Sequence, residues 1–334
     1  MLEYQSMLKK EDSGETKPFV TRVDSRCCEV WHKGDIVQAT LRGKLFEDKN
    51  KDKNPIAVGD FVSLIQEGDD WAIDTILPRQ NTFARRAAGE EQDLRQVLAT
   101  NVTQVLIVNS LGVPPFSSMV ADRILAACTA ADIPSVLIIN KVDLGKASKI
   151  KRIAETYRNC GTQTLLTSAN DHTGIKELGA IIKNQTSVLY GLSGVGKSSL
   201  MNCLEPGLDI KTRQVSNTLK SGKHTTTHSQ WYPLKNGGSV IDTPGVRKFR
   251  PVGIAPTDLR IYFKDIHIFG KNCDYYDCTH REEPGCKVLE ALNAKLLSPS
   301  RYRSYLAILE ELEEVYGGTG RNEEKEGPNH KARR

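Results

Sequence analysis

The chain has 334 residues, a length that suits two or three domains better than a single hydrophobic core. Hydrophobic residues make up 39% and charged residues 26%, as in ordinary folded proteins, and the longest apolar runs are too short to cross a membrane. The formal net charge of +5 permits a polyanionic partner without requiring one. Residues 1–16 lack the basic start and apolar stretch of a secretory signal, so we expect a cytoplasmic protein with no membrane partner.

The N-terminal part of the chain is predicted to form a small β-barrel. We expect a flexible segment over residues 1–29, an OB-type β-barrel over 30–80 and a connector over 81–97. The barrel is predicted from short β-type runs that are separated by glycines and show no helical periodicity. These runs are 36–41, 60–65 and 71–76.

Basic side chains gather in a barrel loop and around the connector. The loop 48–54 holds Lys49, Lys51 and Lys53, and the later residues are Arg79, Arg85, Arg86 and Arg95. Such charges are usually solvated surface groups. The alternative is contact with RNA phosphates, for which the candidates are Lys49, Lys51, Lys53, Arg85 and Arg86.

From about residue 98 the pattern changes to alternating strands and helices, which predicts a central α/β domain over 98–250 with a parallel sheet covered by helices. The expected strands are 102–108, 135–139, 162–166, 186–190 and 239–241. The expected helices are 118–131, 146–158, 174–183 and 197–204.

The run from Gly191 to Ser198 matches the P-loop pattern between an expected strand and an expected helix, which is the context this motif requires. Its glycines let backbone N–H groups surround phosphate oxygens. Lys197 places a cation on the β and γ phosphates, and Ser198 offers a hydroxyl to Mg²⁺. The predicted nucleotide contacts are Gly191, Leu192, Ser193, Gly194, Val195, Gly196, Lys197, Ser198 and Ser199.

The four residues Asn140 to Asp143 read Asn-Lys-Val-Asp after another expected strand, and they indicate guanine. The Asp143 carboxylate can accept from both the N1–H and the exocyclic amine of guanine, while the Lys141 stem lies along the base. Backbone contacts from Ser168 and Ala169 would support the guanine oxygen. We therefore expect GTP and GDP as ligands of Asn140, Lys141, Asp143, Ser168 and Ala169.

The segment Asp242-Thr-Pro-Gly245 is predicted to sense the terminal phosphate. Asp242 would hold Mg²⁺ through water, and the Gly245 N–H would meet the γ-phosphate. Thr225, Thr226 and Thr227 are further candidate Mg²⁺ ligands where a first switch loop belongs, and the sequence does not choose among them. A polar surface loop is the alternative there.

The order of these motifs is circularly permuted, because the guanine-reading segment precedes the P-loop instead of following it. Permutation is tolerated when natural termini lie close together. It places the phosphate-sensing segment directly before the C-terminal part of the chain.

A Cys/His cluster marks a C-terminal helical domain over 251–316. Cys273, Cys278, His280 and Cys286 have the short spacing of a closed, structural Zn²⁺ site, with unrelated buried cysteines as the alternative. Helices are expected over 287–297 and 301–316. The charged tail 317–334 is expected to be disordered.

Together these residues resemble the ribosome-small-subunit-dependent GTPase A family (RsgA, also called YjeQ). The resemblance covers about residues 30 to 310 and rests on 140–143, 191–199, 222–227, 242–245 and the zinc spacing. It implies an OB-type barrel, a permuted GTPase domain and a zinc module. It also implies GTP hydrolysis to GDP and phosphate on the small ribosomal subunit late in its assembly, contact with rRNA, and release of another assembly factor. We expect a monomer.

The residue after Gly245 is Val246, where many GTPases have a Gln that orients the attacking water. Intrinsic hydrolysis should therefore be slow. Either His224 or a group from the partner must position water, and the resemblance favours His224 as a catalytic residue beside Lys197. A surface role for His224 is the alternative.

Two other readings of the whole chain remain. One is an RNA-binding protein with a slow or inactive GTPase timer, which would bind RNA regardless of the nucleotide. The other is a P-loop ATPase or kinase, which Asn140 to Asp143 disfavour and which competition between GTP and ATP would distinguish.

Overall fold

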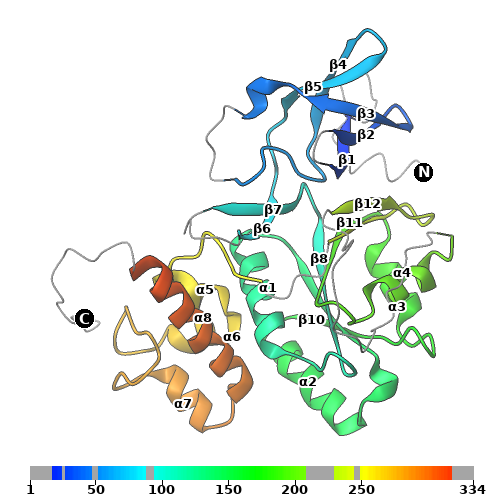
Figure 1. Cartoon of the computed structure of the whole chain (residues 1–334). Coiled ribbons are helices and arrows are strands. Elements are labelled where there is room, and N and C mark those ends of the chain that lie inside the picture. Colours follow the sequence, from blue (N-terminus) through cyan, green and yellow to red (C-terminus); the bar gives the residue numbers. More distant parts are fainter. Residues whose placement is uncertain are drawn as a thin grey trace, which may run out of the picture.

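The computed structural model describes residues 17–24, 27–46, 52–87, 94–207, 229–243 and 249–317. Figure 1 shows three parts: N-terminal strands at one end, a central sheet with helices, and a group of C-terminal helices beside the centre. Among the helices of these described ranges, none is long and apolar enough to span a membrane.

The N-terminal strands form a small barrel. They are β1 (Phe19–Val23), β2 (Cys28–His32), β3 (Asp35–Leu41), β4 (Val62–Glu67) and β5 (Asp70–Ile76), paired in the order β1-β2-β3-β5-β4. Only the β3–β5 pair is parallel, and a bridge between Phe19 and Phe61 brings β1 next to the start of β4. A short 3₁₀ helix, Gly43–Phe46, follows β3. The expected OB-type barrel is confirmed, and the expected runs correspond to β3, β4 and β5.

The barrel begins earlier than the sequence predicts. The expected flexible segment 1–29 includes β1 and the start of β2. Phe19 and Val20 are 3% and 0% exposed, and Arg22 pairs with Gln230 of the central sheet. The apolar run around Phe19 is short and has polar neighbours, so its pattern is weak. Its strand conformation is stabilised by partners distant in the sequence.

The expected connector 81–97 also differs from the structure, because it contains a strand and most of the first half of another. These are β6 (Thr82–Arg86) and β7 (Arg95–Thr100), which pair antiparallel. The paired residues Phe83 and Ala99 are buried. The arginines of this region conceal a buried face that only the fold reveals.

The arginines near the connector are not simply solvated. The guanidinium of Arg79 donates to Asp60 at 2.7 Å and to Asp52 at 2.9 Å, and Arg95 donates to Asp52 at 2.5 Å. The Asp60 side chain is 0% exposed and also accepts from the Thr100 hydroxyl at 2.8 Å. This network connects the barrel to β7, and the prediction of solvated charges is wrong at these residues.

The central sheet is parallel apart from one strand. Its strands are β8 (Gln104–Ser110), β9 (Ser135–Asn140), β10 (Gln163–Leu166), β11 (Thr186–Tyr190), β12 (Gln230–Pro233) and β13 (Ser239–Asp242). The order is β10-β9-β8-β11-β13-β12, with β12 antiparallel to β13 and joined to β1 of the barrel. The carboxyl ends of the five parallel strands therefore meet at one edge.

Helices cover both faces of this sheet, as expected. They are α1 (Ser118–Ala130), α2 (Ala147–Asn159), α3 (Ile175–Ile182) and α4 (Lys197–Leu204), with a 3₁₀ turn at Val142–Leu144. Successive residues of β8 enter different cores: Val105 packs in the core that includes Ile124 of α1, and Leu106 packs with Leu178 of α3. This alternation follows from the two-residue period of a strand that is buried on both faces.

The C-terminal helices form a third core. They are α5 (Leu259–Tyr262), α6 (Lys264–Gly270), α7 (Lys287–Asn293) and α8 (Pro299–Gly317), preceded by a 3₁₀ turn at Pro256–Asp258. Their apolar residues pack around the Cys/His cluster and against Ala126 of α1. The helix expected over 287–297 ends at Asn293, because Lys295 has a positive φ of 59°. The expected tail lies outside the described residues.

Candidate functional site

The P-loop, residues 191–198, connects β11 to α4 at the carboxyl edge of the sheet. Gly194 and Gly196 have φ angles of 84° and 97°, a region that L side chains rarely adopt. A Cβ at Gly191 would lie 2.3 Å from the Val108 carbonyl oxygen, and one at Gly196 would lie 2.4 Å from Asn140 Nδ2. The glycines are therefore required by close approach as well as by backbone conformation. The loop ends at the first turn of α4, whose N–H groups face the position a phosphate would take.

Lys197 and Asp242 supply opposite charges beside this loop. The Lys197 Nζ donates to the carbonyl oxygens of Gly191 at 2.9 Å and Leu192 at 3.3 Å. Burial lowers the pKa of Lys197, and the charge of Asp242 opposes that shift. Burial likewise raises the pKa of Asp242 to about 6, with the Lys197 charge opposing it. The pair is held in a site that favours further charged ligands.

Asp242 has an unsatisfied buried oxygen. Its Oδ1 atom is buried and has no hydrogen-bond partner among the described residues. A buried carboxylate oxygen without a partner is costly unless a cation or water binds there. Ser198 lies partly exposed in the first turn of α4. These two oxygen donors fit the predicted Mg²⁺ site.

The predicted guanine-reading segment is hydrogen-bonded to the P-loop. Asn140, 1% exposed, donates from Nδ2 to the Val195 carbonyl oxygen at 2.9 Å and accepts from the Thr167 hydroxyl at 3.0 Å. Lys141 donates from Nζ to the carbonyl oxygen of Gly194 at 2.6 Å. The segments predicted to bind the base and the phosphates therefore form one connected structure.

The loop after β8 is an additional part of this structure that the motifs do not indicate. Lys141 Nζ also donates to the Val113 carbonyl oxygen at 2.9 Å. Gly112 approaches the Lys141 stem so closely that a Cβ there would lie 3.1 Å from its Cδ atom. Pattern recognition missed this contact, since Gly112 and Val113 belong to no nucleotide motif.

The remaining base-site residues differ in exposure. Asp143 lies exposed in the turn Val142–Leu144. Ser168 is 0% exposed, and its hydroxyl accepts the backbone N–H groups of Asn170 at 3.2 Å and Asp171 at 3.3 Å. Ser168 thus shapes the loop that also contains Ala169, while the Asp143 carboxylate is accessible to a ligand.

Several predicted site residues lie outside the described residues. They are His224, Thr225, Thr226, Thr227, Gly245 and Val246. The basic residues Lys49 and Lys51 lie outside them as well. Arg86, a candidate phosphate contact, is 6% exposed, so the structure does not support that role for it.

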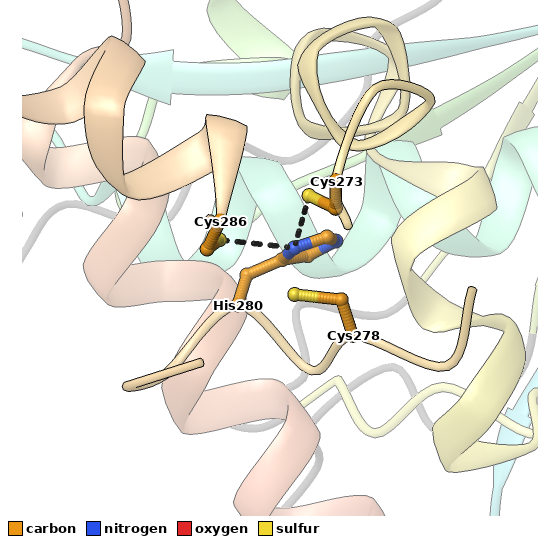
Figure 2. Close-up of side chains that lie close together, drawn as sticks. All are labelled: Cys273, Cys278, His280 and Cys286. Carbon is orange, nitrogen blue, oxygen red and sulfur yellow. Dashed lines mark hydrogen bonds between the residues drawn. The ribbon is translucent and has the colours of Figure 1, made fainter. Parts of the chain in front are cut away.

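The Cys/His cluster forms a compact donor set (Figure 2). The ligand atoms of Cys273, Cys278, His280 and Cys286 all lie within 4.8 Å of one another, and all four residues are buried. His280 Nδ1 lies 3.6 Å from the Cys273 sulfur and 3.5 Å from the Cys286 sulfur. Burial lowers the pKa of His280 to about 4, so its ring is neutral at neutral pH and can donate a lone pair. The four residues fit one metal ion.

Surrounding groups hold the loop of this cluster in shape. The Glu283 carboxylate accepts backbone N–H groups from Thr279 at 2.5 Å and Arg281 at 2.7 Å. From α8, the Tyr302 hydroxyl donates to the His280 carbonyl oxygen at 2.8 Å and the Tyr305 hydroxyl to that of Thr279 at 3.2 Å. Such outer contacts orient metal ligands.

Comparison with known proteins identifies the family. Residues 76–251 match the family model described as RsgA GTPase. The chain is 35% identical over 274 residues to a small ribosomal subunit biogenesis GTPase RsgA of Chlorobaculum parvum, covering 80% of this chain and 88% of the relative. An RsgA protein of Flavobacterium johnsoniae is 35% identical over 291 residues, covering 85% and 89%.

Solved structures agree with this relationship. YjeQ from Thermotoga maritima matches with a TM-score of 0.68 and 30% identity over 89% of this chain and 98% of that protein. YloQ, described as a circularly permuted GTPase, matches with a TM-score of 0.64 and 27% identity, covering 89% of this chain and 95% of YloQ. With its P-loop following its guanine-reading segment, this chain belongs to the RsgA family of GTPases.

Proposed function

We propose that this GTPase acts in biogenesis of the small ribosomal subunit, binding the subunit and hydrolysing GTP to GDP and phosphate while docked. The observation that carries the proposal is the meeting of the P-loop, Asn140 to Asp143, and Asp242 at one sheet edge, between a barrel and a Cys/His module. The names of the relatives support the choice of partner. We place the protein in the cytoplasm as a monomer that contacts rRNA and whose hydrolysis promotes departure of another assembly factor.

The residue roles follow from chemistry and position. GTP phosphates would bind to residues 191–199, with Lys197 neutralising charge on the β and γ phosphates. In doing so Lys197 would exchange its carbonyl contacts within the loop for phosphate oxygens. This exchange is favourable because a charge-assisted hydrogen bond to an anion is stronger than one to a neutral carbonyl.

Base selection is assigned to Asp143, supported by Lys141, Ser168 and Ala169. The exposed Asp143 carboxylate would accept from two donors of guanine that adenine lacks. Asn140 would act indirectly, since its amide is used by Val195 and Thr167.

Mg²⁺ accompanies the substrate and would be held by Ser198, Asp242 and one of Thr225, Thr226 and Thr227. Gly245 is proposed to donate its N–H to the γ-phosphate. We assign water positioning to His224, with a group from the docked subunit as the competing source, since Val246 has no polar side chain.

The metal of the Cys/His cluster is proposed to be a single Zn²⁺. Three sulfurs and one imidazole suit this ion, and four protein ligands leave no open position for catalysis. Its role is therefore structural. It would stabilise the loop 273–286, which α8 contacts through Tyr302 and Tyr305.

The division of labour among domains follows the same order. We propose an RNA-binding barrel, a permuted GTPase domain that ends near residue 250, and a zinc-stabilised helical domain from about residue 251. An OB-type barrel commonly presents a nucleic-acid face, which supports the first assignment.

GTP turnover by the purified protein, with and without isolated small ribosomal subunits, tests the proposal. Large subunits and a Lys197→Ala variant serve as controls. Stimulation by small subunits only, lost in the variant, is the expected result. Equal slow turnover in all wild-type reactions would retain the GTPase and refute the ribosomal assignment.

A further inference from the structure

Glu311 on α8 receives two arginines from the GTPase domain. Its Oε2 atom accepts from Arg123 Nη2 of α1, and its Oε1 atom lies 3.2 Å from Arg250 Nε. The Glu311 and Arg123 side chains are 23% and 16% exposed, so the ion pair between them is largely shielded from solvent. One carboxylate of the C-terminal domain therefore joins two separate places in the GTPase domain.

The first of these places is the chain just after the phosphate-sensing segment. Phe249 is 3% exposed, stacks on Phe83 at 5.7 Å and packs edge-on against Tyr190 at 5.3 Å between ring centroids. The Arg250 carbonyl oxygen accepts the Arg86 N–H at 2.9 Å. Tyr190 is the last residue before the P-loop. Residues 249 and 250 are thus fixed beside the strand that leads to the phosphates.

The chain before this point is attached to the same strand. Thr243 is 1% exposed, and its hydroxyl donates to the Leu189 carbonyl oxygen at 2.9 Å. Residues 244–248, which include Gly245, lie outside the described residues. Their two ends nevertheless meet neighbouring residues of β11, Leu189 and Tyr190. The position of Gly245 relative to the P-loop is limited by these two attachments.

The second place is α1, which lies beside α8 in Figure 1. Arg301 of α8 donates to Asp122 of α1 at 2.6 Å and to Asp265 of α6 at 2.7 Å, and the Arg301 and Asp122 side chains are 4% and 0% exposed. This buried contact docks the start of α8 independently of Glu311. Glu311 contributes a separate contact further along the helix, where Arg250 arrives.

We propose that Glu311 is a positioning residue for the GTPase reaction. By holding Arg250 against α8 and α1, it keeps the C-terminal end of the phosphate-sensing segment where Gly245 can meet the γ-phosphate. The C-terminal domain thereby contributes to the preference for GTP over GDP. The inference rests on the proposed roles of Asp242 and Gly245.

A merely structural role predicts something different. If Glu311 only stabilised the contact between domains, its loss would lower the free energy of unfolding and leave the ratio of GTP to GDP affinity unchanged. A positioning role changes that ratio, because GDP has no γ-phosphate to sense. The ratio therefore separates the two roles.

The experiment measures dissociation constants for GDP and a non-hydrolysable GTP analogue by competition with a fluorescent guanine nucleotide. Glu311→Gln and Arg250→Gln are each expected to weaken binding of the analogue about fivefold while GDP affinity changes less than about twofold. The double variant should be no weaker than either single variant, since both remove one interaction. Glu313→Gln is the matched control: Glu313 lies on the same helix and pairs with Arg281 at 2.6 Å, away from the GTPase domain.

An unchanged affinity ratio in both Glu311→Gln and Arg250→Gln would overturn the inference, as would an equal change in Glu313→Gln. Retained GDP binding shows that the variants fold. Asp242→Asn separates the inference from the function it rests on. Weakened analogue binding in that variant alone would leave the phosphate-site assignment standing without the role of Glu311. Unchanged analogue binding in Asp242→Asn would refute the phosphate-site assignment itself.

Discussion

Lys141 extends from the carboxyl end of β9 to the P-loop, where its Nζ donates a hydrogen bond to the Gly194 carbonyl oxygen at 2.6 Å. The same ammonium group donates to Val113 at 2.9 Å. One side chain of the base-reading segment thus connects two loops at the mouth of the site. Permutation has changed the order of these segments along the chain and preserved their contact in space.

Lys141→Met should weaken binding of GDP and GTP alike by about tenfold, because it removes charge-assisted hydrogen bonds that shape the site for parts common to both nucleotides. Titration with fluorescent GDP and a fluorescent GTP analogue measures this. Lys146→Met is the control, since Lys146 lies exposed a few residues further along. Unequal loss of the two nucleotides would contradict the assigned role.

Binding of Mg²⁺ with a GTP analogue should weaken as the pH falls through about 6, where burial places the pKa of Asp242. Protonation removes the negative charge that would hold the cation, so affinity should fall by at most about tenfold per pH unit below that value. The GTP analogue itself also gains a proton in this range. Asp242→Asn measures the share of the ligand, and an identical pH profile in wild type and variant would contradict the prediction.

Removal of the metal should unfold the C-terminal helices and leave the central sheet folded. Cys278→Ser should lose the bound zinc and about half or more of the stability of that domain, because a structural metal contributes its binding energy to folding. Elemental analysis and circular dichroism with a chelator measure both effects. Cys203→Ser, at a partly exposed cysteine outside the cluster, should retain one zinc per chain. Full zinc content in Cys278→Ser would contradict the site.

Arg79→Met should lower the free energy of unfolding by about 3 kcal/mol, because it leaves the buried Asp60 carboxylate without its main partner. Arg42→Met removes an exposed pair with Asp74 at 2.9 Å and should cost about 0.5 kcal/mol or less. Urea unfolding compares the two. Equal small effects would mean that the Asp60 network adds little to stability.

The parts of the fold that carry strong local patterns could be predicted from the sequence. The strand expected over 186–190 is β11, and the helix expected over 197–204 is α4. Each combines an apolar period with a clear start or end signal. By contrast, β1 and β6 have weak patterns and owe their conformation to pairing with distant residues, so the expected limits of the flexible segment and the connector were wrong.

The candidate site shows the same difference between chemistry and contact. Motif chemistry predicts Lys197, Asp143 and the four metal ligands, because each role requires a particular residue type at a particular spacing. It could not predict that Asn140 uses its amide to hold Val195, or that Glu311 pairs with Arg250. Those contacts join segments far apart in the sequence and depend on how the domains pack.

The most direct test of the account is the base preference of stimulated turnover in an Asp143→Asn variant. Xanthine carries an oxygen where guanine carries its exocyclic amine, so an Asn side chain, which can donate a hydrogen bond, matches xanthine better than a carboxylate does. With small ribosomal subunits present, wild type should hydrolyse GTP and not XTP, and Asp143→Asn should hydrolyse XTP and lose GTP. Continued GTP turnover by the variant, or XTP turnover that small subunits do not stimulate, would contradict a single guanine site under control of the subunit.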